Sequence, residues 1–93
     1  MYLVERYLPG EPSAELARVA RRAESSTAQL RAQGAPIRYL GSTLVSEEQT
    51  CFCLFEAPDS DAVRAANDRA GLSFERIVSA LVVTPEPLGR QSP

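Results

Sequence analysis

The spacing of apolar residues alternates along the chain between the two-residue period of strands and the longer period of helices. Residues 2–8 are rich in Tyr, Leu and Val and end at Pro9-Gly10, which predicts a first strand. Further strands are expected over residues 37–45, 50–56 and 76–84, the last ended by Pro85. The segment 50–56 is apolar on both faces, which is typical of a central strand covered on both sides.

Two segments between these strands carry the helical period instead. The first runs from Ser13, the expected N-cap, to Gly34, and its apolar stripe contains Leu16, Val19, Ala20, Ala23, Thr27 and Leu30. The second begins at Asp59, another expected N-cap. Its inner stripe is Val63, Ala66 and Ala70, and Gly71-Leu72 predicts a Schellman ending.

The resulting order, strand–helix–strand–strand–helix–strand, predicts an α+β fold of the ferredoxin-like βαββαβ type. Right-handed crossovers place both helices on one face of a four-stranded antiparallel sheet. Because the helices are rich in Ala, the opposite face keeps apolar side chains in reach of water, and such a face normally belongs against a partner. We therefore expect a homodimer packed sheet to sheet, a dimeric α/β barrel. The domain is expected over residues 1–85 and a disordered tail over 86–93.

Composition excludes several functions. The chain has 93 residues and net charge −2, and all ten of its basic residues are Arg. It has room for one core, no dense basic stripe for nucleic acid, and no apolar run that could span a membrane. The N-terminal residues lack the pattern of a signal peptide, so a cytoplasmic location is expected. Since there is no His, Ser–His–Asp and Cys–His catalysis are excluded, as are metal sites with imidazole ligands.

Polar residues inside the expected strands and helices are the candidates for a site. Cys51 and Cys53 lie two residues apart on one strand face, an arrangement that rarely meets disulfide geometry, and the simplest interpretation is a pair of buried thiols. Glu5 and Arg6 fall on opposite faces of the first strand, and each needs a partner if buried. Glu5 is either paired in this way or a ligand or general base.

Four more residues are weaker candidates. Asn67 borders the inner stripe of the second helix, where an amide is usually a structural hydrogen-bonding group. Tyr7 and Tyr39 offer phenol groups to a pocket, although packing in the core or in an interface is the more usual role of such aromatic residues. Glu56 ends the third strand and could simply cap the local backbone.

The runs Tyr2-Leu3-Val4-Glu5-Arg6-Tyr7-Leu8-Pro9-Gly10 and Phe52-Cys53-Leu54-Phe55-Glu56-Ala57-Pro58-Asp59 resemble those of a bacterial family of small ferredoxin-like domains that includes nickel-binding proteins. The resemblance implies that His occurs in the metal-binding members at the positions occupied here by Glu5, Tyr7 and Asn67, whereas Cys53 and Glu56 are retained. It therefore implies a metal site reduced to Cys53, Glu5 and Glu56. Nickel prefers imidazole and thiolate, so such a site would hold a divalent ion weakly.

Three hypotheses follow for the function. The first is a small dimeric binding protein with a pocket formed by Glu5, Tyr7, Tyr39, Cys53 and Asn67, for a small ligand or a weakened divalent metal such as nickel. The second is a cofactor-independent oxygenase or isomerase of the dimeric α/β-barrel type, with Glu5 as base and Tyr39 as hydrogen-bond donor. The third is a structural subunit whose open sheet face binds another protein. Strand alternation alone does not decide whether Glu5 faces the helices or the open side.

Overall fold

The computed structural model describes residues 1–10 and 12–85 of the chain. Its elements follow one another as β1 (Tyr2–Tyr7), α1 (Pro12–Ala32), β2 (Arg38–Val45), a 3₁₀ turn (Ser46–Glu48), β3 (Thr50–Glu56), α2 (Ser60–Ala70) and β4 (Arg76–Ser79). The predicted element order is confirmed. The predicted tail, residues 86–93, lies outside the described residues.

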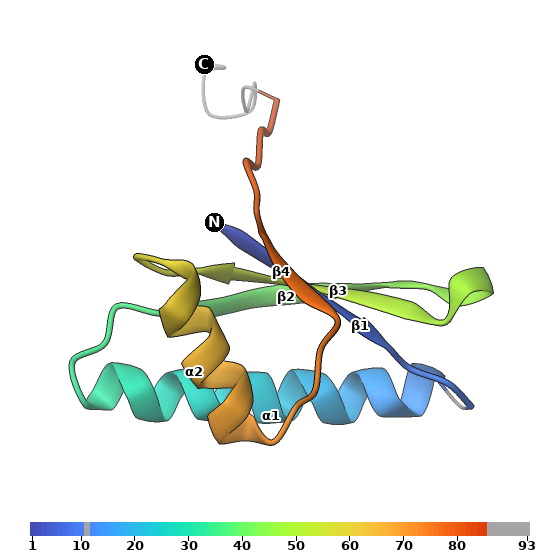
Figure 1. Cartoon of the computed structure of the whole chain (residues 1–93), viewed down its shortest axis with the longest axis horizontal. Helices are drawn as coiled ribbons and strands as arrows, with labels where there is room; N and C mark the ends of the chain where they lie inside the picture. The colour runs from blue at the N-terminus through green and yellow to red at the C-terminus, as the bar shows by residue number, and fades with distance from the viewer. Residues whose placement is uncertain (11, 86–93) are drawn as a thin grey trace, which may run out of the picture.

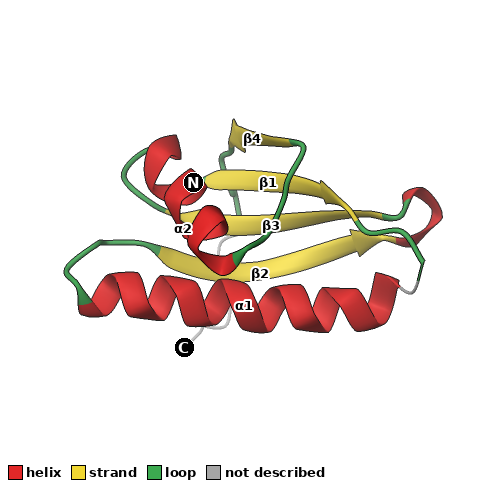
Figure 2. Ribbon diagram, turned by 60° about the horizontal axis from the view of Figure 1, so that its bottom comes forward, coloured by secondary structure: helices red, strands yellow, loops and turns green. Residues whose placement is uncertain are grey.

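The four strands form one antiparallel sheet in the order β2-β3-β1-β4. Both helices lie on the same side of this sheet, with α1 running alongside β2 (Figures 1 and 2). This arrangement confirms the ferredoxin-like α+β fold. Among the residues that the structure describes, no helix combines the length and the apolar character that crossing a bilayer requires.

The ends of the helices follow local side-chain chemistry. Helix α1 begins at Pro12 rather than after Ser13, because proline lacks the amide hydrogen that a first helical residue leaves unpaired. In α2 the predicted cap is confirmed, since Asp59 Oδ1 accepts a hydrogen bond from Ala62 N at 2.9 Å. The Schellman ending is also confirmed: Leu72 N donates to Asn67 O, and Gly71 adopts the left-handed φ of 70° that favours glycine.

The hydrophobic core lies between the sheet and the helices. In β3 the side chains of Cys51, Cys53 and Phe55 are buried there, and they pack with Val63 of α2 and Val19 of α1. The alternate β3 residues, Phe52 and Leu54, point to the other side and are only partly buried. Strand β3 is therefore central, as predicted, but within the described residues only one of its faces is covered by helices.

Strand β4 is shorter than the expected segment 76–84. It ends at Ser79, which pairs with Tyr2, and Ala80 N donates one last hydrogen bond to Met1 O. Residues 80–85 then leave the sheet. They extend away from the body on the side opposite the helices (Figure 1).

Candidate functional site

The sheet separates the predicted site residues into two groups. Glu5 and Tyr7 of β1 point to the open face, where Glu5 lies opposite Phe52. Tyr39, Cys53 and Asn67 lie on the helix side, where they contact or belong to the core. Because side chains on opposite faces of a sheet cannot line one pocket, a single chain does not bring the five predicted pocket residues together.

Arg6 is the most unusual residue on the helix side. Its side chain is only 2% exposed, and no carboxylate contacts it within the described residues. Its Nη2 donates to Asn67 Oδ1 at 2.6 Å, and its Nη1 donates to the carbonyl oxygen of Ser73 at 2.8 Å. The Asn67 amide nitrogen donates in turn to Val63 O at 2.8 Å, which fixes the amide orientation. Asn67 is therefore the structural partner of a buried cation, and the Arg6 Nε remains without a partner in the described chain.

A line of hydroxyl and thiol groups lies beside Arg6 on the same side of the sheet. Cys51 Sγ and Cys53 Sγ are 3.6 Å apart, and both cysteines are free and buried. Cys53 Sγ is 2.9 Å from Ser42 Oγ, which is itself 2.5 Å from the hydroxyl of Tyr39. The Tyr39 ring packs at a tilt against Phe55, so the phenol also contributes to the core.

These contacts shift the pKa values of the two thiols in opposite directions. Hydrogen bonds from Cys51 and Ser42, together with the nearby Arg6 charge, lower the pKa of Cys53 to about 6 despite its burial. The same contact with Cys53, together with burial, raises the pKa of Cys51. Burial also raises the pKa of Tyr39. The Ser42 hydroxyl and the Arg6 charge beside Cys53 therefore favour ionisation at this sulfur over Cys51.

The open face carries a different polar group. Glu5 Oε1 accepts a hydrogen bond from Arg76 Nε at 2.5 Å, and the two residues are paired across β1 and β4. Apolar side chains of the same face surround this pair: Leu3, Phe52, Leu54 and Val78. The Glu5 carboxylate is paired with Arg76, and Tyr39 lies on the other side of the sheet. One chain therefore does not bring together Glu5 as the predicted base and Tyr39 as the predicted hydrogen-bond donor of an enzyme.

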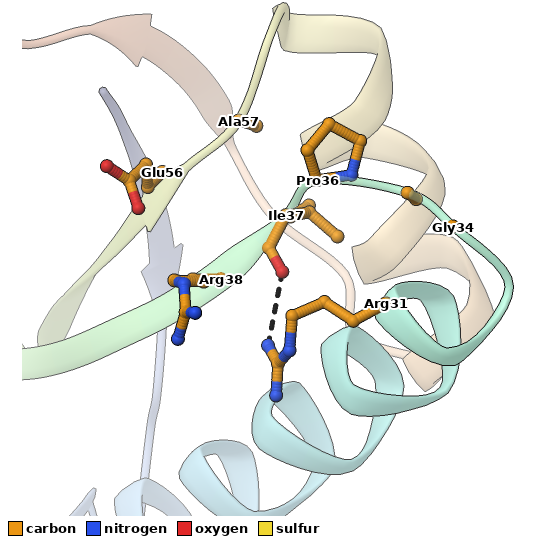
Figure 3. Close-up of a pocket in the computed structure, with 8 residues that line it drawn as sticks. Arg31, Gly34, Pro36, Ile37, Arg38, Glu56 and Ala57 are labelled. Carbon is orange, nitrogen blue, oxygen red and sulfur yellow. Dashed lines mark hydrogen bonds between the residues drawn. The ribbon is translucent and has the colours of Figure 1, made fainter.

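A hollow on the described surface contains one predicted site residue, Glu56. It has a volume of about 430 Å³ and lies where α1 passes into β2 (Figure 3). Arg31 closes one side by donating from Nη1 to Ile37 O at 3.1 Å. The hollow is lined by Arg31, Gly34, Ala35, Pro36, Ile37, Arg38, Glu56 and Ala57.

The three predicted metal ligands do not converge within one chain. Cys53 points to the helix side, whereas Glu5 lies opposite Phe52 on the open face, four residues and about 13 Å along β3 from Glu56. In the described part of the chain, no three Cys, Asp or Glu residues are grouped so that they could hold a metal ion, and the sequence contains no His. The donor set of a single chain thus does not fit a nickel site.

Comparison with protein families places the chain in a known family, although the donor set of a single chain does not fit a nickel site. Residues 2–79 match the model of a family described as "Nickel responsive protein SCO4226-like". The chain belongs to this family. The match spans all four strands and both helices, and it confirms the resemblance seen in the sequence. No curated protein and no solved structure gives a significant match to the chain.

The sequence interpretation missed three residues of these clusters, namely Ser42, Ser73 and Arg76. Under simple alternation Tyr39 and Ser42 fall on opposite faces of β2. A bulge between Tyr39 and Gly41 shifts the register and brings both side chains to the helix side. The isolated Gly41 inside a strand pattern was the available signal for this bulge.

Replacing Asn67 by Ala should destabilise the fold strongly. It removes the acceptor of Arg6 Nη2 and leaves a buried guanidinium with one partner, Ser73 O, so we expect a loss of about 3–5 kcal/mol in the free energy of unfolding. Chemical denaturation measures this loss. The neighbouring exposed Asp68→Ala is the control and should change stability by less than about 0.5 kcal/mol. Equal effects of the two substitutions would contradict the role given to Asn67.

The Cys53 thiolate predicts a pH dependence of stability. Because the pKa of Cys53 is lowered from 9.0 to about 6 in the folded chain, its ionisation stabilises the fold at high pH, and this contribution is lost as the pH falls through 6. Between pH 6 and 9 the midpoint of thermal unfolding should rise by several degrees, and Cys53→Ser should remove most of the rise. Cys51→Ser is the matched control, since its hydroxyl can still donate to Cys53. Parallel pH profiles for native protein and Cys53→Ser would show that Cys53 does not ionise in this range.

Proposed function

We propose that this protein is a non-enzymatic binding protein that works as a homodimer, with the open faces of two sheets turned toward each other. The observation that carries the proposal is that both helices cover one face of the sheet, while the other face carries partly exposed apolar residues around the Glu5–Arg76 pair. A contiguous face of this kind is rarely left to water in a soluble protein.

The composition of the open face supports self-association. Phe52 and Leu54 lie at the centre of the sheet on β3, and Leu3 and Val78 flank them on β1 and β4. Two-fold symmetry places the same patch on both copies, so an apolar patch meets an apolar patch. The Glu5–Arg76 pairs of the two chains are enclosed at the same time and supply the polar contacts of the interior.

The ligand site of this proposal is the space between the two sheets. Glu5, Arg76 and Tyr7 of each copy face it, and a small polar ligand or a divalent ion held by carboxylates would find its partners there. The name of the family refers to a nickel response. In this chain the nickel-preferring donors are reduced to two buried thiols beside a cation, so we propose that Cys53 is structural and that any ion binds weakly through carboxylates.

Placing a charge at the centre of the open face tests the dimer. Leu54→Glu should convert the protein into a folded monomer, because a carboxylate would be buried between the sheets without a partner. Light scattering at micromolar concentrations measures the mass, and circular dichroism checks the fold. Ala28→Glu, on the exposed side of α1, is the control and should remain dimeric. A native protein that is monomeric under these conditions would refute the homodimer and favour a different protein partner for the face.

Nickel titration tests the assignment of Cys53. If Cys53 is structural, the thermal stabilisation produced by added Ni²⁺ should be small and should be the same, relative to each starting stability, in native protein and Cys53→Ser. Glu5→Gln should lose whatever stabilisation there is, since it removes the carboxylate of the interior. A nickel shift that disappears in Cys53→Ser and persists in Glu5→Gln would instead place the ion at the thiols.

A further inference from the structure

We propose that Cys51 and Cys53 together form a binding site for one soft monovalent metal ion, of which Cu⁺ is the biological example. The site lies on the helix side of the sheet and does not involve the open face. The inference goes beyond the proposed function, in which these thiols hold no divalent ion, and it does not depend on the proposed dimer.

The two sulfur atoms are already placed as a pair of ligands. Both cysteines are free, both side chains extend from β3 to the helix side, and their Sγ atoms are 3.6 Å apart. Metal–sulfur bonds in proteins are about 2.3 Å long, so one ion beside this pair can contact both sulfurs. Rotation of either side chain about its Cα–Cβ bond can widen the gap toward the linear S–metal–S arrangement that Cu⁺ accepts.

The number and the kind of donors select the ion. Within the described chain, no third Cys, Asp or Glu joins the two cysteines. The polar neighbour is the hydroxyl of Ser42, 2.9 Å from Cys53 Sγ, and a neutral hydroxyl is a poor ligand for a soft ion. A structural zinc ion requires four ligands. Cu⁺ prefers thiolates and is satisfied by two of them, so it fits the donors that are present.

Arg6 supplies the counter-charge that such a site needs. One Cu⁺ with two thiolates carries one net negative charge, and a buried charge is costly unless an opposite charge lies beside it. Arg6 lies opposite Cys51 in the pairing of β1 with β3, its side chain is buried, and its Nε has no hydrogen-bond partner in the described chain. Two thiolates thus balance two cations, the metal ion and the guanidinium. A divalent ion on the same thiolates would leave the guanidinium without a counter-charge.

The apolar surroundings also suit Cu⁺. Both cysteines are fully buried, and they pack in the core with Val4 and Phe55. An apolar shell controls the access of solvent to a metal site, and it protects bound Cu⁺ from oxidation. Binding releases the remaining thiol protons to solvent and changes no oxidation state. Because the sulfurs are buried, the ion enters through a local opening or during folding.

Anaerobic competition for Cu⁺ tests the site. Reduced full-length protein, either folded or refolded in the presence of Cu⁺, should take one equivalent of the ion from a chromogenic Cu⁺ chelator. X-ray absorption of the loaded native protein should show two sulfur ligands and no nitrogen or oxygen ligand. Cys51→Ser and Cys53→Ser should each weaken binding by about a hundredfold or more. Ser42→Ala removes a hydroxyl but no sulfur, so it is the control and should bind nearly as tightly as native protein.

Asn67→Asp tests the charge balance. The new carboxylate replaces the amide oxygen that Arg6 Nη2 contacts at 2.6 Å, so the guanidinium acquires a counter-charge of its own. The anionic metal site then loses its partner, and the affinity for Cu⁺ should fall by about tenfold. Ala65→Asp adds the same charge at an exposed position of α2 and should leave the affinity unchanged. Circular dichroism checks that both variants are folded.

The outcomes are independent of the mass of the native protein, and so they are distinct from those that test the dimer. If neither folded nor refolded protein retains Cu⁺ against the chelator, or if the bound ion has nitrogen or oxygen ligands, the thiol pair is not the site. If Cys51→Ser binds Cu⁺ as tightly as native protein, the paired site is wrong. If Asn67→Asp does so, Arg6 does not balance the charge of the site.

Discussion

One-sided coverage of the sheet governs the whole molecule. Two helices are enough to bury the residues that point to one side of four strands, and the strand period then sends every second residue to the uncovered side. In β3 this places Cys51, Cys53 and Phe55 in the core, whereas Phe52 and Leu54 face outward. The division separates the candidate residues into a group that faces the helices and a group that faces the open side.

The buried group is organised around a cation without a carboxylate partner. Arg6 is held by the amide of Asn67 and the carbonyl of Ser73, and its charge favours the thiolate form of the nearby Cys53. A metal cation beside these thiols would have to compete with the guanidinium. The family to which the chain belongs is named for a nickel response, and in this chain Cys53 is buried with Cys51, Ser42 and the Arg6 guanidinium nearby.

Some residues of these groups could be found from the sequence, and others could not. Asn67 was recognisable as a hydrogen-bonding group because it borders an apolar stripe, and the pairing of Glu5 with an arginine was one of two open interpretations. The contact of Ser42 with Tyr39 depends on a bulge in β2, which strand alternation does not contain. The convergence of Cys53, Glu5 and Glu56, implied by the family resemblance, is not found because the sheet itself lies between the thiol and the carboxylates.

The sequence by itself determined the elements and their order, since hydrophobic period, caps and turn residues act over a few neighbouring positions. It determined the cap at Asp59, the ending at Gly71 and the central place of β3 in the same way. Only the tertiary structure decided which side of the sheet Glu5 faces and where β4 ends. These features depend on which strands lie side by side. Arg76 and Glu5 are 71 positions apart in the chain but adjacent in the sheet, and the pairing of β4 with β1 extends from Arg76 opposite Glu5 to Ser79 opposite Tyr2.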